Sequence, residues 1–149
     1  MSLTNNVNGI YWIGAPAMNF DLRNMTITGN TDVGVFVSGL PGSSFKLRGS
    51  TVSGNAHDGV WLNGTMTAHL GTAASPGGNT FTGNGSAGLH SSADAGQTVD
   101  AVGNTWVSGQ QGADANGFYL TPVTYTPVPK LGPLNGMNFK IDIPTTLNL

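Results

Sequence analysis

Short stretches in which apolar and polar residues alternate recur along the chain. In GVFVS (34–38) and GVWLN (59–63), aliphatic side chains occupy every second position, which predicts half-buried β-strands. Each stretch begins with a glycine followed by an apolar residue, and this pair starts at positions 9, 34, 59, 88 and 117. The spacings of 25, 25, 29 and 29 residues predict a structural repeat.

Each repeat contains three such stretches. The first is found at 20–22, 45–47, 68–70 and 99–101, the second at 26–28, 51–53, 80–82 and 105–107, and the third at 9–13, 34–38, 59–63, 88–92 and 117–121. One face of every stretch is apolar, so together they can enclose one apolar interior. Three strands per repeat of 25–29 residues predict an all-β fold, a parallel β-helix of about five coils.

Several motifs resemble the right-handed parallel β-helix repeats of the pectin-lyase-like superfamily. They are GNTDVGVFV (29–37), GNAHDGVWL (54–62) and NTFTGN (79–84), and the stretch 70–84 is similar to a poorly characterised bacterial branch of that group. The resemblance covers about residues 5–121 and implies a right-handed solenoid with an extracellular or cell-surface location. It selects no single function, because this scaffold carries lyases, hydrolases, phage tailspikes and inert spacers.

The two ends of the chain depart from the repeat. The stretch at 9–13 is a third strand with no first or second strand before it, so we expect the β-helix at 1–121 to be a fragment of a longer solenoid. In the tail at 122–149, prolines at 122, 127, 129 and 133 disfavour ladder pairing. We expect this tail to cap the open end, because exposed sheet edges must be covered.

Composition narrows the classes of partner. Charged residues make up 8% of the chain and the net charge is −2, which predicts no electrostatic attraction to nucleic acid or to an anionic membrane. No segment approaches 18 consecutive apolar residues, and the start MSLTNNVNG lacks the pattern of a signal peptide. Cysteine is absent, and His57, His69 and His90 occupy different positions of the repeat, so we expect no metal site and no cofactor.

Outward positions of successive coils stack into columns, and the third strand carries a column of rings. The column comprises Tyr11, Phe36, Trp61, His90 and Tyr119. The apolar C–H faces of sugars pack well on such rings, so these five residues are the candidate ligand-binding site. Three other interpretations stay open: the tail covers the column, a second subunit covers it, or the rings only stabilise the ladder.

The first strand carries most of the charge. Its outward columns contain Asp21, Lys46, His69 and Asp100, with Arg23 and Arg48 beside them. In pectate-lyase-like enzymes, which the motifs resemble, such a face holds Ca²⁺-binding acids and a base, and this implies Asp21 and Lys46 as catalytic candidates. Asp21 and Asp100 are three coils apart, roughly 14 Å, and cannot share one Ca²⁺. The alternative is a solvated ladder of weakly paired charges.

The tripeptide Asn30-Thr31-Asp32 resembles the Asn-Thr-Asp element of polygalacturonase-like glycoside hydrolases. The resemblance implies a catalytic role for Asp32 with His57 and Asp58, which lie one coil further on. The Gly-His-Gly and Arg-Ile-Lys elements of that family are absent. Two carboxylates roughly 5–10 Å apart can hydrolyse a glycosidic bond, a distance that Asp32 and Asp58 could meet. The alternative is that these turn residues bind the local backbone through Asx hydrogen bonds.

Two further columns are polar. The Asn residues in NNVNG, TGNTD, SGNAH and TGNGS predict an internal ladder in which each amide bonds to the next coil. The second strand carries Thr at 26, 51, 80 and 105, with hydroxyls again at 28, 53 and 82. This lattice resembles that of some ice-binding solenoids, although Thr is favoured on any exposed strand.

Three functional hypotheses follow from the sequence. The first is a non-catalytic, surface-exposed β-helix that contacts polysaccharide, or another copy of the chain, through the ring column; the open coil ends are a second route to a homo-oligomer. The second is a polysaccharide lyase or glycoside hydrolase that uses Asp32, His57 and Asp58, or the face that carries Asp21 and Lys46. The third is a structural spacer of a larger exported protein.

Overall fold

The computed structural model describes residues 1–14, 18–92, 97–106 and 123–124. Every regular element in these ranges is a β-strand, which confirms the all-β prediction. The strands are β1 (Ser2–Thr4), β2 (Ile10–Ile13), β3 (Asn19–Arg23), β4 (Thr26–Thr28), β5 (Val35–Arg48), β6 (Thr51–Ser53), β7 (Val60–Gly71), β8 (Thr80–Thr82), β9 (Leu89–Ser91), β10 (Thr98–Ala101), β11 (Thr105–Trp106) and β12 (Val123–Thr124).

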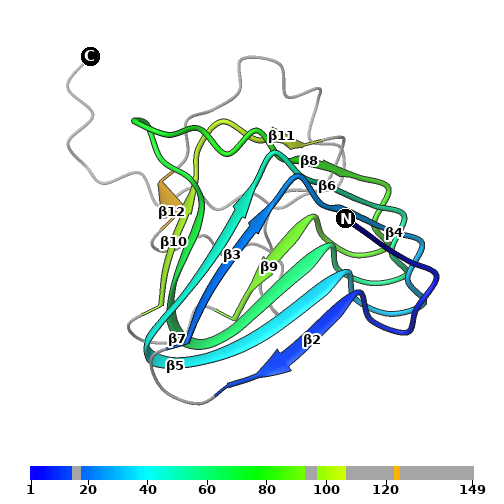
Figure 1. Cartoon of the computed structure of the whole chain (residues 1–149), viewed down its shortest axis with the longest axis horizontal. Helices are drawn as coiled ribbons and strands as arrows, with labels where there is room; N and C mark the ends of the chain where they lie inside the picture. Colours follow the sequence, from blue (N-terminus) through cyan, green and yellow to red (C-terminus); the bar gives the residue numbers. More distant parts are fainter. Residues whose placement is uncertain (15–17, 93–96, 107–122, 125–149) are drawn as a thin grey trace.

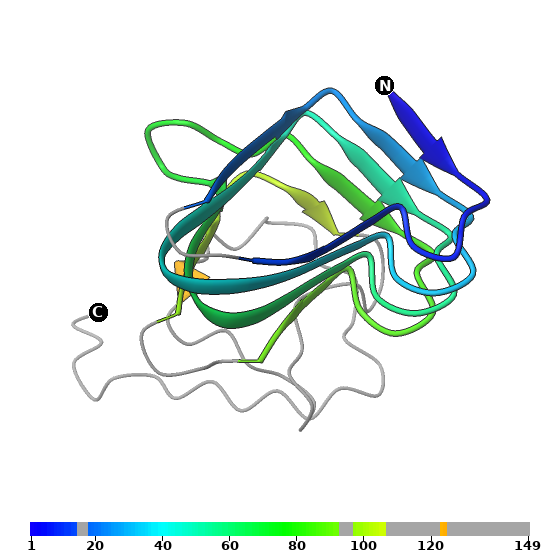
Figure 2. The ribbon, with the colours of Figure 1, turned by 60° about the horizontal axis from the view of Figure 1, so that its bottom comes forward.

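These strands form two parallel sheets. One has the order β1-β4-β6-β8-β11, and the other has the order β12-β10-β7-β5-β2, with β3 also paired to β5 and β9 to β7. Strands of successive repeats lie side by side, so the chain winds into a parallel β-solenoid of about four turns (Figure 1). Figure 2 shows the first sheet as a stack of arrows coloured from dark blue to yellow-green.

Two long strands join segments that the sequence predicts as separate. β5 and β7 each contain the third strand of one repeat and the first strand of the next, connected by a bend. Their register shifts between Gly39 and Ser43, where β5 carries more residues than β7. Backbone pairing therefore continues around this corner of the solenoid, and the two outward faces on either side of it share the same strands.

The first strand of the chain corrects one prediction. β1 pairs in parallel with β4, with Ser2 opposite Thr26 and Thr4 opposite Thr28. The chain therefore enters the solenoid at a second strand, and the prediction that no such strand precedes residues 9–13 is wrong. The sequence SLT contains a single apolar residue between two polar ones, which is too short to give a periodic signal.

Register elsewhere follows the glycine spacing of the repeat. Val35 lies opposite Ile10 and Val60. A Cβ added to Gly59 would lie 2.6 Å from the carbonyl oxygen of Gly88, and one added to Gly34 would lie 2.5 Å from that of Gly59. Neighbouring coils approach too closely for a side chain at this position, which explains the glycines at 34 and 59.

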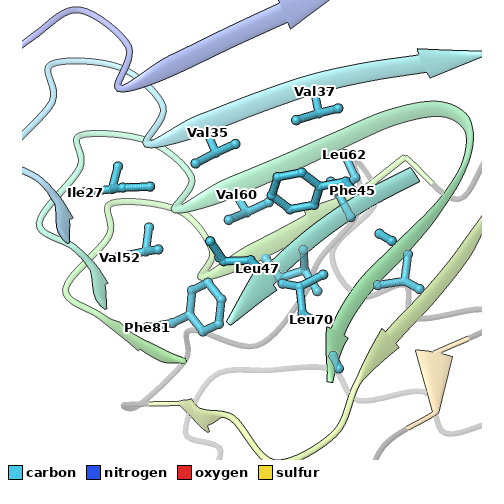
Figure 3. Close-up of a cluster of buried hydrophobic side chains, with 14 of the residues drawn as sticks. Ile27, Val35, Val37, Phe45, Leu47, Val52, Val60, Leu62, Leu70 and Phe81 are labelled. Carbon is cyan, nitrogen blue, oxygen red and sulfur yellow. The ribbon is translucent and has the colours of Figure 1, made fainter. Parts of the chain in front are cut away.

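The interior is a continuous apolar core between the sheets. Ile27, Val52 and Phe81 project from one sheet toward Val35, Val60, Leu47 and Leu70 of the other (Figure 3). Between the paired strands β8 and β11, the ring of Phe81 stacks on Trp106 with centroids 4.4 Å apart. Burying each large side chain contributes about 1.5–3 kcal/mol, so this core is a main source of the stability of the fold.

The predicted Asn ladder is present inside one turn. Asn30 Nδ2 donates to Asn55 Oδ1 at 2.7 Å, and Asn55 Nδ2 donates to Asn84 Oδ1 at 2.8 Å. Each acceptor oxygen also receives the backbone N–H of the preceding Asn, at 3.2 Å in both cases. The side chains thus satisfy buried backbone donors where the sheet hydrogen bonds end.

A second ladder at another turn was not predicted. Asn79 Nδ2 donates to Asn104 Oδ1 at 2.8 Å, and Asn79 Oδ1 accepts the backbone N–H of Ser50 at 3.0 Å. The repeated Gly-Asn pair at 78–79 and 103–104 is the signal that could have indicated it.

The fifth predicted third strand and most of the predicted tail lie outside the described residues. Within the tail, β12 pairs in parallel with β10, with Val123 opposite Val99. The larger sheet therefore extends by one strand into that segment. The capping role of the tail stays a prediction.

Candidate functional site

The predicted ring column is in register on four successive strands. We call Tyr11, Phe36, Trp61 and His90 the ring ladder; each residue lies directly opposite the next. Tyr11 stacks on Phe36 with centroids 4.9 Å apart, and Trp61 stacks on His90 at 4.9 Å with an interplanar angle of 2°. Phe36 and Trp61 meet edge to face at 86°. The ladder is therefore two stacked pairs at right angles rather than one flat platform. The remaining predicted member, Tyr119, lies outside the described residues.

Exposure falls steeply along the ring ladder. Tyr11 is 61% exposed, Phe36 and Trp61 are half-buried, and the His90 side chain is 15% exposed. The indole Nε1 of Trp61 is buried without a hydrogen-bond partner among the described residues. An unpaired buried donor costs about 1–3 kcal/mol, so Trp61 is held by packing and not by its polar atom.

Asp58 anchors the buried end of the ladder. One carboxylate oxygen accepts the backbone N–H of Ala87 at 3.0 Å, and the other lies 2.9 Å from His90 Nδ1. Asp58 is itself buried, at 6% exposure. A buried carboxylate with both oxygens engaged stabilises the turn and orients the imidazole.

Asp32 and His57 form an exposed pair on the neighbouring position of the turn. His57 Nδ1 lies 2.7 Å from Asp32 Oδ1, and both side chains are largely open to solvent. The structure thus brings two of the three turn candidates together and gives Asp58 different partners. A catalytic role for Asp32, His57 and Asp58 stays a prediction.

On the charged face, Asp21 and Arg23 form a bidentate ion pair. Arg23 Nε and Nη2 donate to the two carboxylate oxygens of Asp21 at 2.8 and 2.9 Å. This hydrogen bonding lowers the pKa of Asp21 below its ordinary value of 3.8 and raises the pKa of Arg23. Asp21 also lies opposite Lys46 in the strand register, so the two catalytic candidates of this face are neighbours.

Lys46 and Arg48 lie on the same strand beside His69. His69 Nδ1 is 2.9 Å from Asp100 Oδ2, which fixes the ring across two coils. Arg48 Nη1 donates to the carbonyl oxygens of Leu47, at 3.0 Å, and His69. Burial, and then the neighbouring charge of Arg23, lower the pKa of Arg48.

These cationic side chains line a groove with a volume of about 640 Å³. Its lining includes Arg23, Lys46, Arg48 and His69, together with Thr72, Ser75 and Pro76 from the loop after β7. We call this the cationic groove. It lies beyond the bend in β5 and β7 from the ring ladder, where β3 runs beside the second half of β5 (Figure 1).

Within the described residues, His and Asp side chains form pairs, and no group of three or more could hold a metal ion. The part of the chain that the structure describes has no helix long and apolar enough to span a bilayer.

Sequence reasoning missed the pairing of every histidine with an aspartate. His57 and Asp32 stand at the same turn position one coil apart, and His69 and Asp100 are neighbours in one column, so the repeat could have indicated both pairs. His90 and Asp58 come from different positions of the repeat. That contact depends on side-chain direction, which spacing alone does not give.

Comparison with known proteins gives one match. The model of a family described as proteins of unknown function, DUF1565, matches residues 2–110. No curated protein and no solved structure matches the chain. The resemblance to the pectin-lyase-like superfamily therefore stays a prediction. Because the family match covers well over half of its residues, this parallel β-solenoid belongs to the DUF1565 family.

Proposed function

We propose that this protein is a non-catalytic solenoid module that contacts polysaccharide through the exposed end of the ring ladder. The observation that carries the proposal is the register of four rings on successive coils, ending in Tyr11, which is 61% exposed. Ile13 on the same strand is also 66% exposed, so this end of the ladder presents open apolar surface beside the tyrosine ring.

The chemistry of this face suits a sugar chain. Tyr11 and Phe36 offer apolar ring surface, and the next outward position on β5 and β7 carries the polar side chains Ser38 and Asn63. Asn63 Nδ2 donates to Ser38 Oγ at 3.3 Å, which is a long bond that a sugar hydroxyl can replace. Apolar surface flanked by a few polar groups is the usual composition of a carbohydrate contact.

The geometry restricts the contact to one half of the ladder. Trp61 and His90 are packed face to face, and His90 is tied to the buried Asp58. The edge-to-face junction at Phe36 interrupts any flat surface. We therefore assign sugar contact to Tyr11 and Phe36, and support of these rings to Trp61 and His90.

A glycan-array screen followed by titration tests the proposal. We expect Tyr11→Ala to weaken binding of the selected glycan about tenfold, since the ring contact is worth more than 1 kcal/mol. Trp61→Phe keeps a ring and is expected to change affinity less than twofold. The matched control is Val7→Ala, which truncates a side chain that is 67% exposed at a turn away from the ladder.

Two results would overturn the proposal. One is the absence of any bound glycan, or binding that Tyr11→Ala leaves unchanged. The other is a dimer in light scattering that becomes a monomer on Tyr11→Ala, which would assign the ladder to contact between copies of the chain.

A further inference from the structure

The cationic groove gathers the positive charge of the described chain. Arg23, Lys46 and Arg48 are the Lys and Arg side chains within the described ranges, and all three line it. The chain has five such residues in total, and only 8% of its residues are charged. Three cations that line one groove in so weakly charged a protein form a local positive field.

Counter-charges lie beside the groove but not in its lining. Among the described carboxylates, Asp21 is held by Arg23, and Asp100 by His69. Asp32 and Asp58 lie in the turn that precedes the ring-bearing strands, and they pair with His57 and His90. Lys46 makes no hydrogen bond or ion pair within the described residues, so its ammonium group is available to a ligand.

Arg48 is held in place as part of the groove wall. Two backbone carbonyls, from Leu47 and from His69 on the next coil, accept from its Nη1. Arg23 lies directly opposite Arg48 in the register of β3 and β5. Two guanidinium groups on adjacent coils repel each other, and an anion between them would relieve that repulsion.

We propose that the cationic groove binds a tetrahedral oxyanion, a sulfate or phosphate group that is either free or carried as a monoester on a sugar. Its positive groups come from three separate side chains on two coils and line a space open to solvent. A monoester presents three acceptor oxygens in different directions and can meet all three cations. A carboxylate presents two oxygens in one plane and can meet fewer.

The lining of the groove also includes neutral polar groups. The loop is closed by reciprocal backbone bonds between Thr72 and Ser75, and Thr72 Oγ1 accepts the N–H of Ser75 at 3.1 Å. This compact turn adds two hydroxyl-bearing residues to the lining of the groove. The proposal does not depend on the ring ladder, which lies on the other side of the strand bend.

Titration of the full chain at low ionic strength tests the proposal, with NMR shifts or calorimetry as the readout. The probes are inorganic sulfate, inorganic phosphate and glucose 6-sulfate, with acetate as the carboxylate control. We expect saturable binding of sulfate and phosphate, and tighter binding of glucose 6-sulfate if the natural source is a sugar ester. Lys46→Gln should weaken sulfate binding about fivefold, because one exposed charge-assisted bond is lost.

Two further variants make the result specific. Asp21→Asn removes a negative charge next to the groove and should tighten sulfate binding about twofold. Tyr11→Ala should leave it unchanged. The proposal is overturned by absent or non-saturable binding, by equal affinity for acetate and sulfate, or by unchanged affinity in Lys46→Gln whose circular dichroism matches the unaltered protein.

Discussion

The Asn ladder inside the turn and the ring ladder on the surface are each built from one side chain per coil. Asn30, Asn55 and Asn84 are buried, and both polar ends of each amide serve the backbone or the next amide. The ring ladder changes residue type at every coil and ends in an exposed tyrosine. Both columns place equivalent positions of successive coils side by side. The Asn ladder is a fixed hydrogen-bond network, whereas the ring ladder is a surface whose residues vary.

The contrast has a physical origin in what each position must satisfy. At the turn, backbone groups have lost their sheet partners and water is excluded, so only a side chain with donor and acceptor at the right length fits. On the outer face, strand hydrogen bonds are complete without the side chain. Any residue that packs on its neighbour is tolerated there, so the identity of the residue can be determined by binding.

The largest effect on the buried Asn ladder is expected from Gly59→Ala. Its Cβ would lie 2.6 Å from a backbone oxygen and 2.8 Å from Asn84 Nδ2, so both the coil spacing and the ladder must shift. We expect a loss of at least about 3 kcal/mol in the free energy of unfolding, or failure to fold. Urea denaturation measures this.

Gly42→Ala is the control for that experiment. Gly42 has φ of 85°, but nothing lies within 4 Å of an added Cβ. The cost should be the backbone term alone, about 1–2 kcal/mol. Equal losses for the two variants would show that coil spacing is not what selects glycine at position 59.

A smaller effect is expected from removing one amide of the ladder. Asn55→Ala leaves two donors of Asn30, the backbone N–H and Nδ2, without their shared acceptor. Asn84 Oδ1 loses the Nδ2 donor of residue 55 and keeps only the backbone N–H of that residue. We expect a loss of about 2–4 kcal/mol in the free energy of unfolding. Chemical denaturation followed by circular dichroism measures it.

Asn63→Ala sharpens the contrast, since the same residue type is removed from the outer face. Its amide makes a 3.3 Å bond to Ser38 and faces outward. The expected change is within about 0.5 kcal/mol. If Asn63→Ala were as costly as Asn55→Ala, burial would not be the factor that separates the two columns.

The sequence predicted much of this arrangement, because residues one repeat apart in the sequence lie opposite each other on neighbouring strands. Phe36 lies opposite Trp61, and Lys46 opposite Asp21, as alternation and the 25-residue period require. Strand β1 was missed, because three residues carry no periodicity. The bend that fuses two predicted strands into β5 was also missed, because backbone pairing around a corner leaves no pattern in side-chain type.

The candidate sites were less predictable than the columns that contain them. Spacing placed Trp61 in a ring column but could not show that it meets Phe36 at 86° and His90 at 2°, since ring orientation depends on rotamers. The cationic groove is lined in part by the loop that carries Thr72, Ser75 and Pro76. That loop belongs to the inserted stretch TAASPGG (72–78), which in the repeat pattern is only extra length.

The mildest test concerns the exposed pair of Asp21 and Arg23. Hydrogen bonding from Arg23 is the main cause that lowers the pKa of Asp21, ahead of the more distant charges of Lys46 and Arg48. Arg23→Gln should therefore raise that pKa toward 3.8, and Lys46→Gln should raise it less. NMR titration of the Asp21 carboxyl group measures both.

The sign of the linked stability change follows from the lowered pKa. A carboxyl group whose pKa is lower in the folded state than in the unfolded state stabilises the fold at pH values above its unfolded-state pKa. This contribution is lost as the pH falls through the folded-state pKa. The window therefore lies below pH 3.8, and at neutral pH Arg23→Gln should change stability little because the pair is exposed. A large loss at neutral pH would mean that this outer column supports the coil as the Asn ladder does, and the distinction between the inner and outer columns would fail.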